Sequence, residues 1–305
     1  TRSAGRTRAA AAADSTSGGI ALSTSCSRRM AANPAVRAEA VRAVPAARVV
    51  PPLRARCGTG TAGQHRRVRI ATFNVRHCAR PGRWARLAAT SRTVAGLGAD
   101  LVALQELDVG MRRSFLRDQA RRLADVNGHQ LVFASTVERD GGRYGIALTS
   151  RWPLTDVVIE ELPRKGRREP RAAIVATCHP RDTAPLTVVA THLQNGRGPG
   201  LADRGAMSQL AWLLGVVNRR VAAAGADVGP VTVLAGDLNT DRAGALLGPA
   251  GFEWAPSTPT FPASQPRRHI DWIAVRGATI EGWEVPEVAD SDHRPLVIEV
   301  TPTGL

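Results

Sequence analysis

The sequence is poor in several residue types, and each shortage narrows what the protein can be. Among 305 residues there is one lysine, Lys165, so arginine carries almost all of the positive charge. Aromatic residues make up 4% of the chain, with a single tyrosine, so no stacking platform for nucleic-acid bases is expected. No run of about 18 apolar residues occurs, so no transmembrane segment is expected. The cysteines form no C-x-x-C pair and have no histidine at zinc-finger spacing, which argues against a disulfide framework or a structural zinc site.

Positive charge is concentrated at the start of the chain. The formal net charge is +15, but residues 1–69 hold thirteen arginines against Asp14 and Glu39, a balance of +11 that leaves +4 for the remainder. Residues 1–66 are rich in Ala, Arg, Ser and Pro and follow no helix or strand period, so we expect a disordered segment outside the fold. The body, 67–303, is then nearly neutral. Two explanations of the basic segment stay open: contact with nucleic acid or a membrane surface, or a composition bias.

Short apolar runs alternate with loops and helical patterns beyond residue 67. Apolar residues at helical spacing predict helices over 83–96, with Trp84 and Leu87 on the apolar face, and over 203–221. Apolar runs predict strands over 68–73, 101–104, 131–134, 145–149, 157–160, 172–178, 186–190, 231–235, 270–275 and 296–300. Many short strands with few helices predict an α/β protein in which helices cover two packed sheets.

Polar residues close several of these strands, among them Asn74, Glu106, His192 and Asp237. Each of them alone fits the start of a solvated turn. Together they predict a site, because strand ends of one sheet system converge on a shared cleft. Packed carboxylates repel one another unless a cation lies between them. Carboxylate and amide oxygens suit a hard ion such as Mg²⁺ or Mn²⁺.

Other catalytic plans lack their residues. A Walker A loop requires Gly-Lys-Ser/Thr, whereas Lys165 is followed by Gly166. The chain has no G-x-S-x-G elbow for a serine hydrolase and no H-E-x-x-H for a zinc peptidase. Metal-assisted hydrolysis is the plan that remains.

Seven motifs give the chain a family resemblance. They are Thr72-Phe73-Asn74-Val75, Leu104-Gln105-Glu106, Arg143-Tyr144-Gly145, Thr191-His192-Leu193, Gly236-Asp237-Leu238-Asn239-Thr240, Ile270-Asp271-Trp272-Ile273 and Ser291-Asp292-His293-Arg294-Pro295. In this order, over about residues 68–300, the sequence resembles the endonuclease/exonuclease/phosphatase superfamily of the deoxyribonuclease-I-like fold, in particular its small bacterial metal-dependent hydrolases. The resemblance implies a four-layer α/β sandwich of two packed mixed β-sheets flanked by helices.

The resemblance also implies a metal site and a base. Glu106 matches the principal ligand of a divalent ion, Mg²⁺ or Mn²⁺, with Asn74 and Asp292 in support. Asp237 and Asn239 match the pair that orients the attacking water or a phosphate oxygen. Of these two, Asp237 is the first choice for the general base.

Four further residues match positions that contact the phosphate or support those that do. His293 resembles the essential histidine of the final motif, and Asp271 resembles the acid that orients it. His192 matches a phosphate-binding or charge-stabilising partner, and Tyr144 a hydrogen-bond donor to the phosphate.

The substrate is less constrained than the chemistry, because the family includes nucleases, inositol-phosphate phosphatases, sphingomyelinases and other phosphodiesterases. The nearly neutral body and the few aromatics favour a phosphodiesterase or phosphatase acting on a small or lipid-linked phosphoester. A nuclease acting on DNA or RNA is the alternative, and a binding module without catalysis is a remote one. We expect a monomer, and leave open whether it works in the cytoplasm or is secreted.

Overall fold

The computed structural model describes residues 37–38, 67–181, 183–196, 201–224, 231–256 and 258–303. All of them belong to one compact unit, Pro34–Leu305. The predicted disorder of residues 1–66 falls outside the described residues, apart from the two-residue strand β1 (Arg37–Ala38), which pairs antiparallel with β4 (Gln130–Arg139). The domain boundary near residue 67 therefore stays a prediction.

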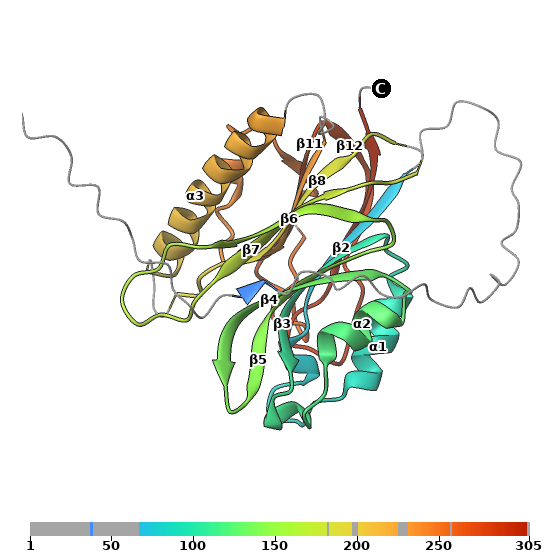
Figure 1. Ribbon diagram of the computed structural model, residues 1–305, viewed down its shortest axis with the longest axis vertical. Coiled ribbons are helices and arrows are strands. Elements are labelled where there is room, and N and C mark those ends of the chain that lie inside the picture. The colour runs from blue at the N-terminus through green and yellow to red at the C-terminus, as the bar shows by residue number, and fades with distance from the viewer. Residues whose placement is uncertain are drawn as a thin grey trace, which may run out of the picture. The chain divides into compact units, whose positions relative to one another are not determined.

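The described strands form two mixed sheets (Figure 1). The larger sheet consists of β1 and β4, introduced above, together with β2 (Val68–Asn74), β3 (Leu101–Val109), β5 (Gly142–Ser150), β12 (Ala278–Glu284) and β13 (Leu296–Pro302). Its strand order is β1-β4-β5-β3-β2-β13-β12. The smaller sheet consists of β6 (Leu154–Glu161), β7 (Ala172–Cys178), β8 (Leu186–His192), β9 (Thr232–Asp237), β10 (Glu253–Trp254) and β11 (Asp271–Arg276). Its strand order is β10-β11-β9-β8-β7-β6.

Each sheet contains one parallel pair among antiparallel neighbours, β2 with β3 and β8 with β9. The two strands of a parallel pair end at the same edge of their sheet. Asn74 therefore lies beside Gln105 in the larger sheet, and His192 lies beside Asp237 in the smaller one. This arrangement brings four of the predicted motifs to the ends of two strand pairs.

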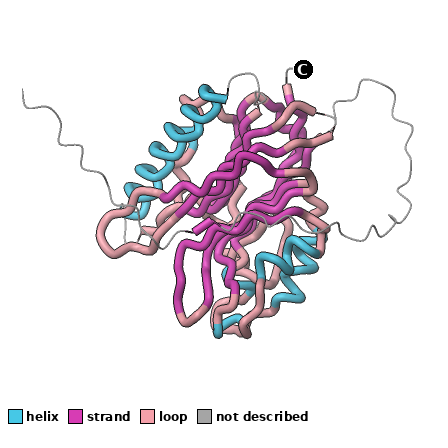
Figure 2. Tube along the Cα trace, in the orientation of Figure 1, coloured by secondary structure: helices cyan, strands magenta, loops and turns pink. Residues whose placement is uncertain are grey.

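Helices cover the outer faces of both sheets, as the tube in Figure 2 shows. The larger sheet packs against α1 (Leu87–Gly96) and α2 (Gln119–Asp125), and the smaller sheet against α3 (Leu201–Ala224) and α4 (Gly244–Leu247). Three apolar layers result, one between the sheets and one under each helical layer. The predicted four-layer sandwich of two packed mixed sheets is confirmed.

Two local expectations were wrong. Helix α1 begins at Leu87 rather than at residue 83, because Pro81 and Gly82 form a turn just before it. Trp84 precedes the helix and is 74% exposed, so it is not part of the buried face, which Thr90, Ser91 and Val94 form with the partly buried Leu87. None of the described helices combines the length and apolarity that crossing a bilayer requires.

Candidate active site

Strand alternation places the polar residues at the end of the apolar layer between the sheets. In β2, Ile70 faces that layer, so the residue four positions later, Asn74, points the same way. The same period carries Val188 to His192 in β8, and Val233 to Asp237 in β9. The site is therefore the polar continuation of the core between the two sheets.

Glu106 reaches this face by a different route. By alternation it would share the outer face of Val102 and Leu104, which pack under the helices. The register of β3 against β5 shifts between Leu104 and Leu107, and Glu106 there has a φ of 61°. A β-bulge of this kind inserts an extra residue and re-aims a side chain. As a result Glu106 Oε1 accepts a hydrogen bond of 3.0 Å from Asn74 Nδ2.

Asp237 lies at the centre of the site. Its Oδ2 accepts a 3.0 Å hydrogen bond from Asn74 Nδ2, and it is 3.5 Å from His192 Nε2 and 3.8 Å from His293 Nε2. Its Oδ1 accepts a 2.9 Å hydrogen bond from the backbone N–H of Asn239, which has a left-handed φ of 54°. The carboxylate is therefore held in one orientation from both sheets.

The tautomer of His192 follows from its neighbours. Its Nδ1 lies 3.2 Å from Nη1 of Arg171, and a guanidinium can only donate. The proton of the neutral ring is therefore on Nε2, which faces Asp237. Burial and the charge of Arg171 lower the pKa of His192 well below 6.5, so the ring is neutral at pH 7. A buried neutral donor thus points into the site.

His293 is in the opposite state because an acid accompanies it. Its Nδ1 donates to Asp271 Oδ2 over 2.8 Å, and Thr260 donates its hydroxyl to the same oxygen. Burial alone would lower the pKa of His293, but the charge and hydrogen bond of Asp271 outweigh it and raise the pKa to about 10. A positive imidazolium therefore faces Asp237 Oδ2.

Asp237 and Glu106 share one neutral hydrogen-bond donor, and of the two Asp237 also faces the positive His293. Both accept from one neutral amide, that of Asn74. Burial, and then the charge of Asp271, raise the pKa of Asp237 above its ordinary value. Asp237, Asp271 and His293 offer ligand atoms within 4.8 Å of one another, and Asp271 Oδ1 is buried and accepts no hydrogen bond from the described residues. The carboxylate oxygens of Asp237 and Asp271 are ligands of the kind that a hard divalent cation prefers, whereas the imidazolium of His293 offers none.

The other predicted site residues lie around this centre. Asp292 precedes His293, and its Oδ2 is 3.1 Å from Arg76 Nε. The amide oxygen of Asn74 accepts from the Arg76 N–H over 3.0 Å, so direct ligation of a cation through this oxygen would replace that bond.

Tyr144 is buried, and its pKa lies well above 10, because of burial first and the charge of Glu106 second. Its hydroxyl therefore stays protonated and able to donate. Asn239 uses its own amide to donate to Leu193 O over 3.1 Å, which ties the loop after β9 to the loop after β8.

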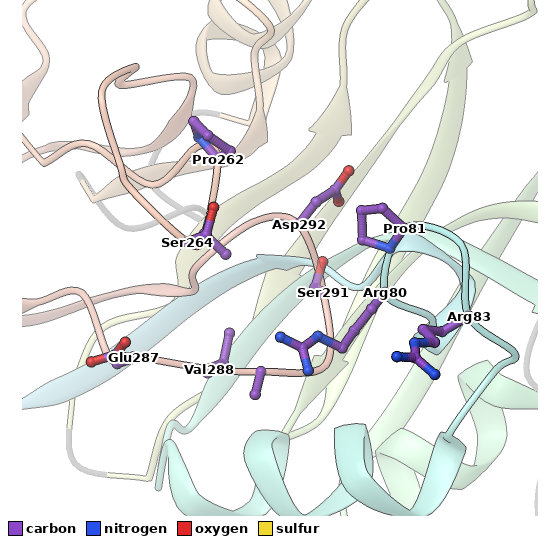
Figure 3. Close-up of a pocket in the computed structure, with 11 residues that line it drawn as sticks. Arg80, Pro81, Arg83, Pro262, Ser264, Glu287, Val288, Ser291 and Asp292 are labelled. Carbon is purple, nitrogen blue, oxygen red and sulfur yellow. The ribbon is translucent and has the colours of Figure 1, made fainter.

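A cavity of about 600 Å³ opens beside Asp292 (Figure 3). Two acids line it, and each is paired: Asp292 with Arg76, and Glu287 with Arg294 over 3.3 Å. Arg80 and Arg83 line it from the opposite loop, and neither forms an ion pair with a described acid. The cavity therefore has an excess of positive charge next to the predicted metal site.

Three supporting residues were missed by the sequence analysis. Arg171 sets the tautomer of His192, Thr260 orients Asp271, and Ser291 accepts the His293 N–H while donating to Asn74 O over 2.7 Å. Ser291 stood in a quoted motif and could have been found there. Arg171 follows the charged stretch Arg167-Arg168-Glu169, and Thr260 stands between Pro259 and Phe261, but no motif assigned either residue to the site.

The protein is a two-sheet α/β sandwich, and acids and histidines line a candidate site at the ends of its strands. Residues 71–293 match the family described as the Endonuclease/Exonuclease/phosphatase family. The chain belongs to this family, whose members are hydrolases of phosphoesters. Comparison with curated protein sequences gives no match.

Several solved structures share the fold. An endonuclease/exonuclease/phosphatase from Beutenbergia cavernae is 21% identical, with a TM-score of 0.63 over 78% of this chain and 72% of that one. The human Nocturnin catalytic domain with bound sulfate is 19% identical, with a TM-score of 0.63 over 79% and 95%. ANGEL2, a 2',3'-cyclic phosphatase, is 15% identical, with a TM-score of 0.58 over 77% and 95%. At these identities the likeness is one of fold.

Proposed function

We propose that this chain is a divalent-metal-dependent phosphoester hydrolase, a phosphodiesterase or phosphatase of small or lipid-linked substrates. The observation that carries the proposal is the convergence on Asp237 Oδ2 of three groups from different elements, Asn74, His192 and His293. A carboxylate held this way, beside one neutral and one positive imidazole, suits proton transfer next to an anionic substrate.

Glu106, with Asn74 and Asp292 in support, would hold the cation, Mg²⁺ or Mn²⁺. Such a cation supplies neutralisation of phosphate charge and polarisation of the P–O bond. Asp237 lies beside these residues, and its raised pKa suits a general base that takes a proton near neutral pH.

The remaining side chains divide the work on the phosphate. Asp237 accepts a proton from the attacking water, and Asn239 N–H keeps its carboxylate in place. The imidazolium of His293, held by Asp271, stabilises negative charge on the phosphorane-like transition state or on the leaving oxygen. His192 Nε2–H and the Tyr144 hydroxyl are neutral donors for phosphate oxygens, and neither adds a charge that would hold the product.

The substrate class is argued from charge and from the cavity. The body of the chain carries little net charge, which gives weak attraction to a long polyanion. The 600 Å³ cavity beside Asp292 is the size of a small-molecule or headgroup site. The fold neighbour ANGEL2 is a 2',3'-cyclic phosphatase, so a cyclic phosphodiester is a substrate of one protein with this fold.

A panel of substrates tests the proposal. Bis(p-nitrophenyl) phosphate, sphingomyelin, a phosphoinositide and supercoiled plasmid are each incubated with Mg²⁺, Mn²⁺ or EDTA. We expect metal-dependent turnover of the chromogenic diester and of one lipid or small substrate, and loss of both in Glu106→Gln. Turnover in EDTA, or no turnover of any substrate, overturns the proposal. Metal-dependent plasmid nicking without turnover of the small or lipid esters would make the chain a nuclease instead, provided that Glu106→Gln abolishes it.

A further inference from the structure

Three large apolar side chains are exposed near the end of the loop that lines the cavity beside Asp292. Of the five large hydrophobic residues exposed among the described ones, Trp84, Phe115 and Leu116 are 74%, 59% and 65% accessible. The rings of Trp84 and Phe115 lie 5.9 Å apart at an angle of 44°. We call these three residues the aromatic tip. Exposed apolar clusters of this kind usually mark a surface that another partner covers.

The backbone holds part of the tip in place. Phe115 and Leu116 have left-handed φ values of 58° and 57°, which L-residues rarely adopt in succession. Their loop is closed by hydrogen bonds from Leu116 N to Met111 O and from Gly110 N to Arg117 O, of 3.0 and 3.1 Å. The outward direction of both side chains is therefore built into a closed loop.

Arginines outnumber acids around the tip, where Asp118 beside Arg117 is the acid that follows the loop. Residues 76–99 and 109–117 contain no Asp or Glu. These two segments meet where Trp84 contacts Phe115, and a composition bias alone would not remove acids from both. Arg86, Arg92 and Arg117 share a cavity of about 370 Å³ with Phe115. Six arginines of these segments form no ion pair with a described acid: Arg80, Arg83, Arg86, Arg92, Arg112 and Arg117.

The tip and the active-site cavity share one loop. Arg80 and Arg83 stand at the two ends of a turn closed by a 3.0 Å hydrogen bond from Arg83 N to Arg80 O. Its central residues are Pro81 and Gly82, and Gly82 has the φ of +68° that a type II turn requires at this position. Figure 3 shows both arginines beside the cavity that Asp292 lines, and Trp84 follows them directly in the chain.

We propose that the aromatic tip and its unpaired arginines dock on an anionic phospholipid surface and present the cavity beside Asp292 to the headgroups. Tryptophan and phenylalanine partition into the interface between headgroups and acyl chains, and arginines at the same level attract anionic lipids. Leu116 favours this partner over a nucleic acid, because an aliphatic side chain gains from an acyl layer but offers no ring for a base to stack on. The inference deepens the proposed function, and rests on it for the reaction at the headgroup phosphate.

Vesicle sedimentation of the full chain tests the docking without requiring turnover. Vesicles of phosphatidylcholine alone are compared with vesicles that contain about 30% phosphatidylserine. We expect binding to the anionic vesicles only. The double variant Trp84→Ala/Phe115→Ala should weaken it at least about tenfold, since it removes the groups that insert. Arg86→Glu/Arg117→Glu should also weaken it at least about tenfold, because each basic residue contributes near the surface.

Matched controls keep the test specific. Trp283→Ala removes a tryptophan that is 50% exposed elsewhere, on β12, and Arg181→Glu reverses an exposed arginine outside the patch; both should bind like the wild type. Equal circular dichroism spectra establish that the variants fold. Failure of the wild type to bind anionic vesicles, or unchanged binding by the tip variant, overturns the inference. Tighter binding to a single-stranded oligonucleotide that the same variants abolish also overturns it and assigns the patch to nucleic acid. A chain that binds vesicles but hydrolyses no phosphoester in the panel refutes the proposed function alone.

Discussion

We expect substitutions around the Asp271–His293 ion pair to lower catalysis by different amounts. Asp271 is fully buried, and its Oδ2 accepts from both His293 Nδ1 and the Thr260 hydroxyl. Asp271→Asn keeps the shape but removes the charge that raises the pKa of His293 to about 10. Burial is then opposed only by the charges of Asp237 and Asp292, so the pKa of His293 falls and the imidazolium is less stable. We expect kcat/KM to fall by about 10²- to 10⁴-fold, the scale of one acid–base or charge-stabilising group.

The loss of kcat/KM should be smaller for variants that leave the charge of Asp271 in place. Thr260→Val removes one neutral donor to Asp271 and leaves the ion pair, so a loss of about tenfold is expected. Thr258→Val is the matched control: Thr258 is buried in the same loop, but its hydroxyl contacts His269 rather than Asp271. Its turnover should remain within about twofold of the wild type.

The assay is hydrolysis of bis(p-nitrophenyl) phosphate, followed by absorbance, with thermal melting to verify folding. The reasoning is refuted if folded Asp271→Asn keeps more than about a tenth of the wild-type kcat/KM. It is also refuted if Thr258→Val loses as much activity as Thr260→Val.

Further predictions concern the positioning of the site and the domain boundary. Arg171→Met removes the donor to His192 Nδ1 and frees the ring to change tautomer. We expect kcat to fall about tenfold with a smaller change in KM. Kinetics equal to those of the wild type would contradict the assigned tautomer. Gly236→Ala would place a Cβ 2.0 Å from Thr191 O, between β8 and β9, and should lower the free energy of unfolding in urea by at least about 3 kcal/mol. Gly282→Ala, with open space at its Cβ, should change the unfolding free energy by less than about 1 kcal/mol. A chain that begins at residue 67 should hydrolyse the chromogenic ester like the full chain, and a large loss would place residues 1–66 in the enzyme.

Alternation explains which site residues the sequence could predict. Asn74, His192 and Asp237 stand an even number of positions after core residues of their strands, so a strand pattern with a polar end is enough to place them. Glu106 stands on the wrong parity and reaches the site only through the bulge in β3, which the apolar pattern does not reveal. Its place just after an apolar run and its motif pointed to it, whereas its parity did not.

The missed elements are those with a weak apolar pattern. Strand β12 is an edge strand whose residues alternate between partly exposed and exposed beyond Ala278, so it has no continuous apolar run. Helix α2 spans only about two turns, with Leu123 as its one large buried apolar residue. Trp84 was assigned to a helix face because its spacing from Leu87 fits a helix, whereas the helix begins only at Leu87 and leaves Trp84 outside.

Binding of Mn²⁺ to Glu106→Gln tests the central claim most directly. Glu106 accepts its hydrogen bond from Asn74, so glutamine preserves the size of the side chain but removes the charge that would hold a cation. Titration calorimetry should show Mn²⁺ binding to the wild type and to Glu138→Gln, an exposed control on β4, with affinity at least about tenfold weaker in Glu106→Gln. Turnover should fall with binding while the melting temperature stays near that of the wild type. Mn²⁺ affinity and turnover equal to those of the wild type would contradict a metal site at Glu106.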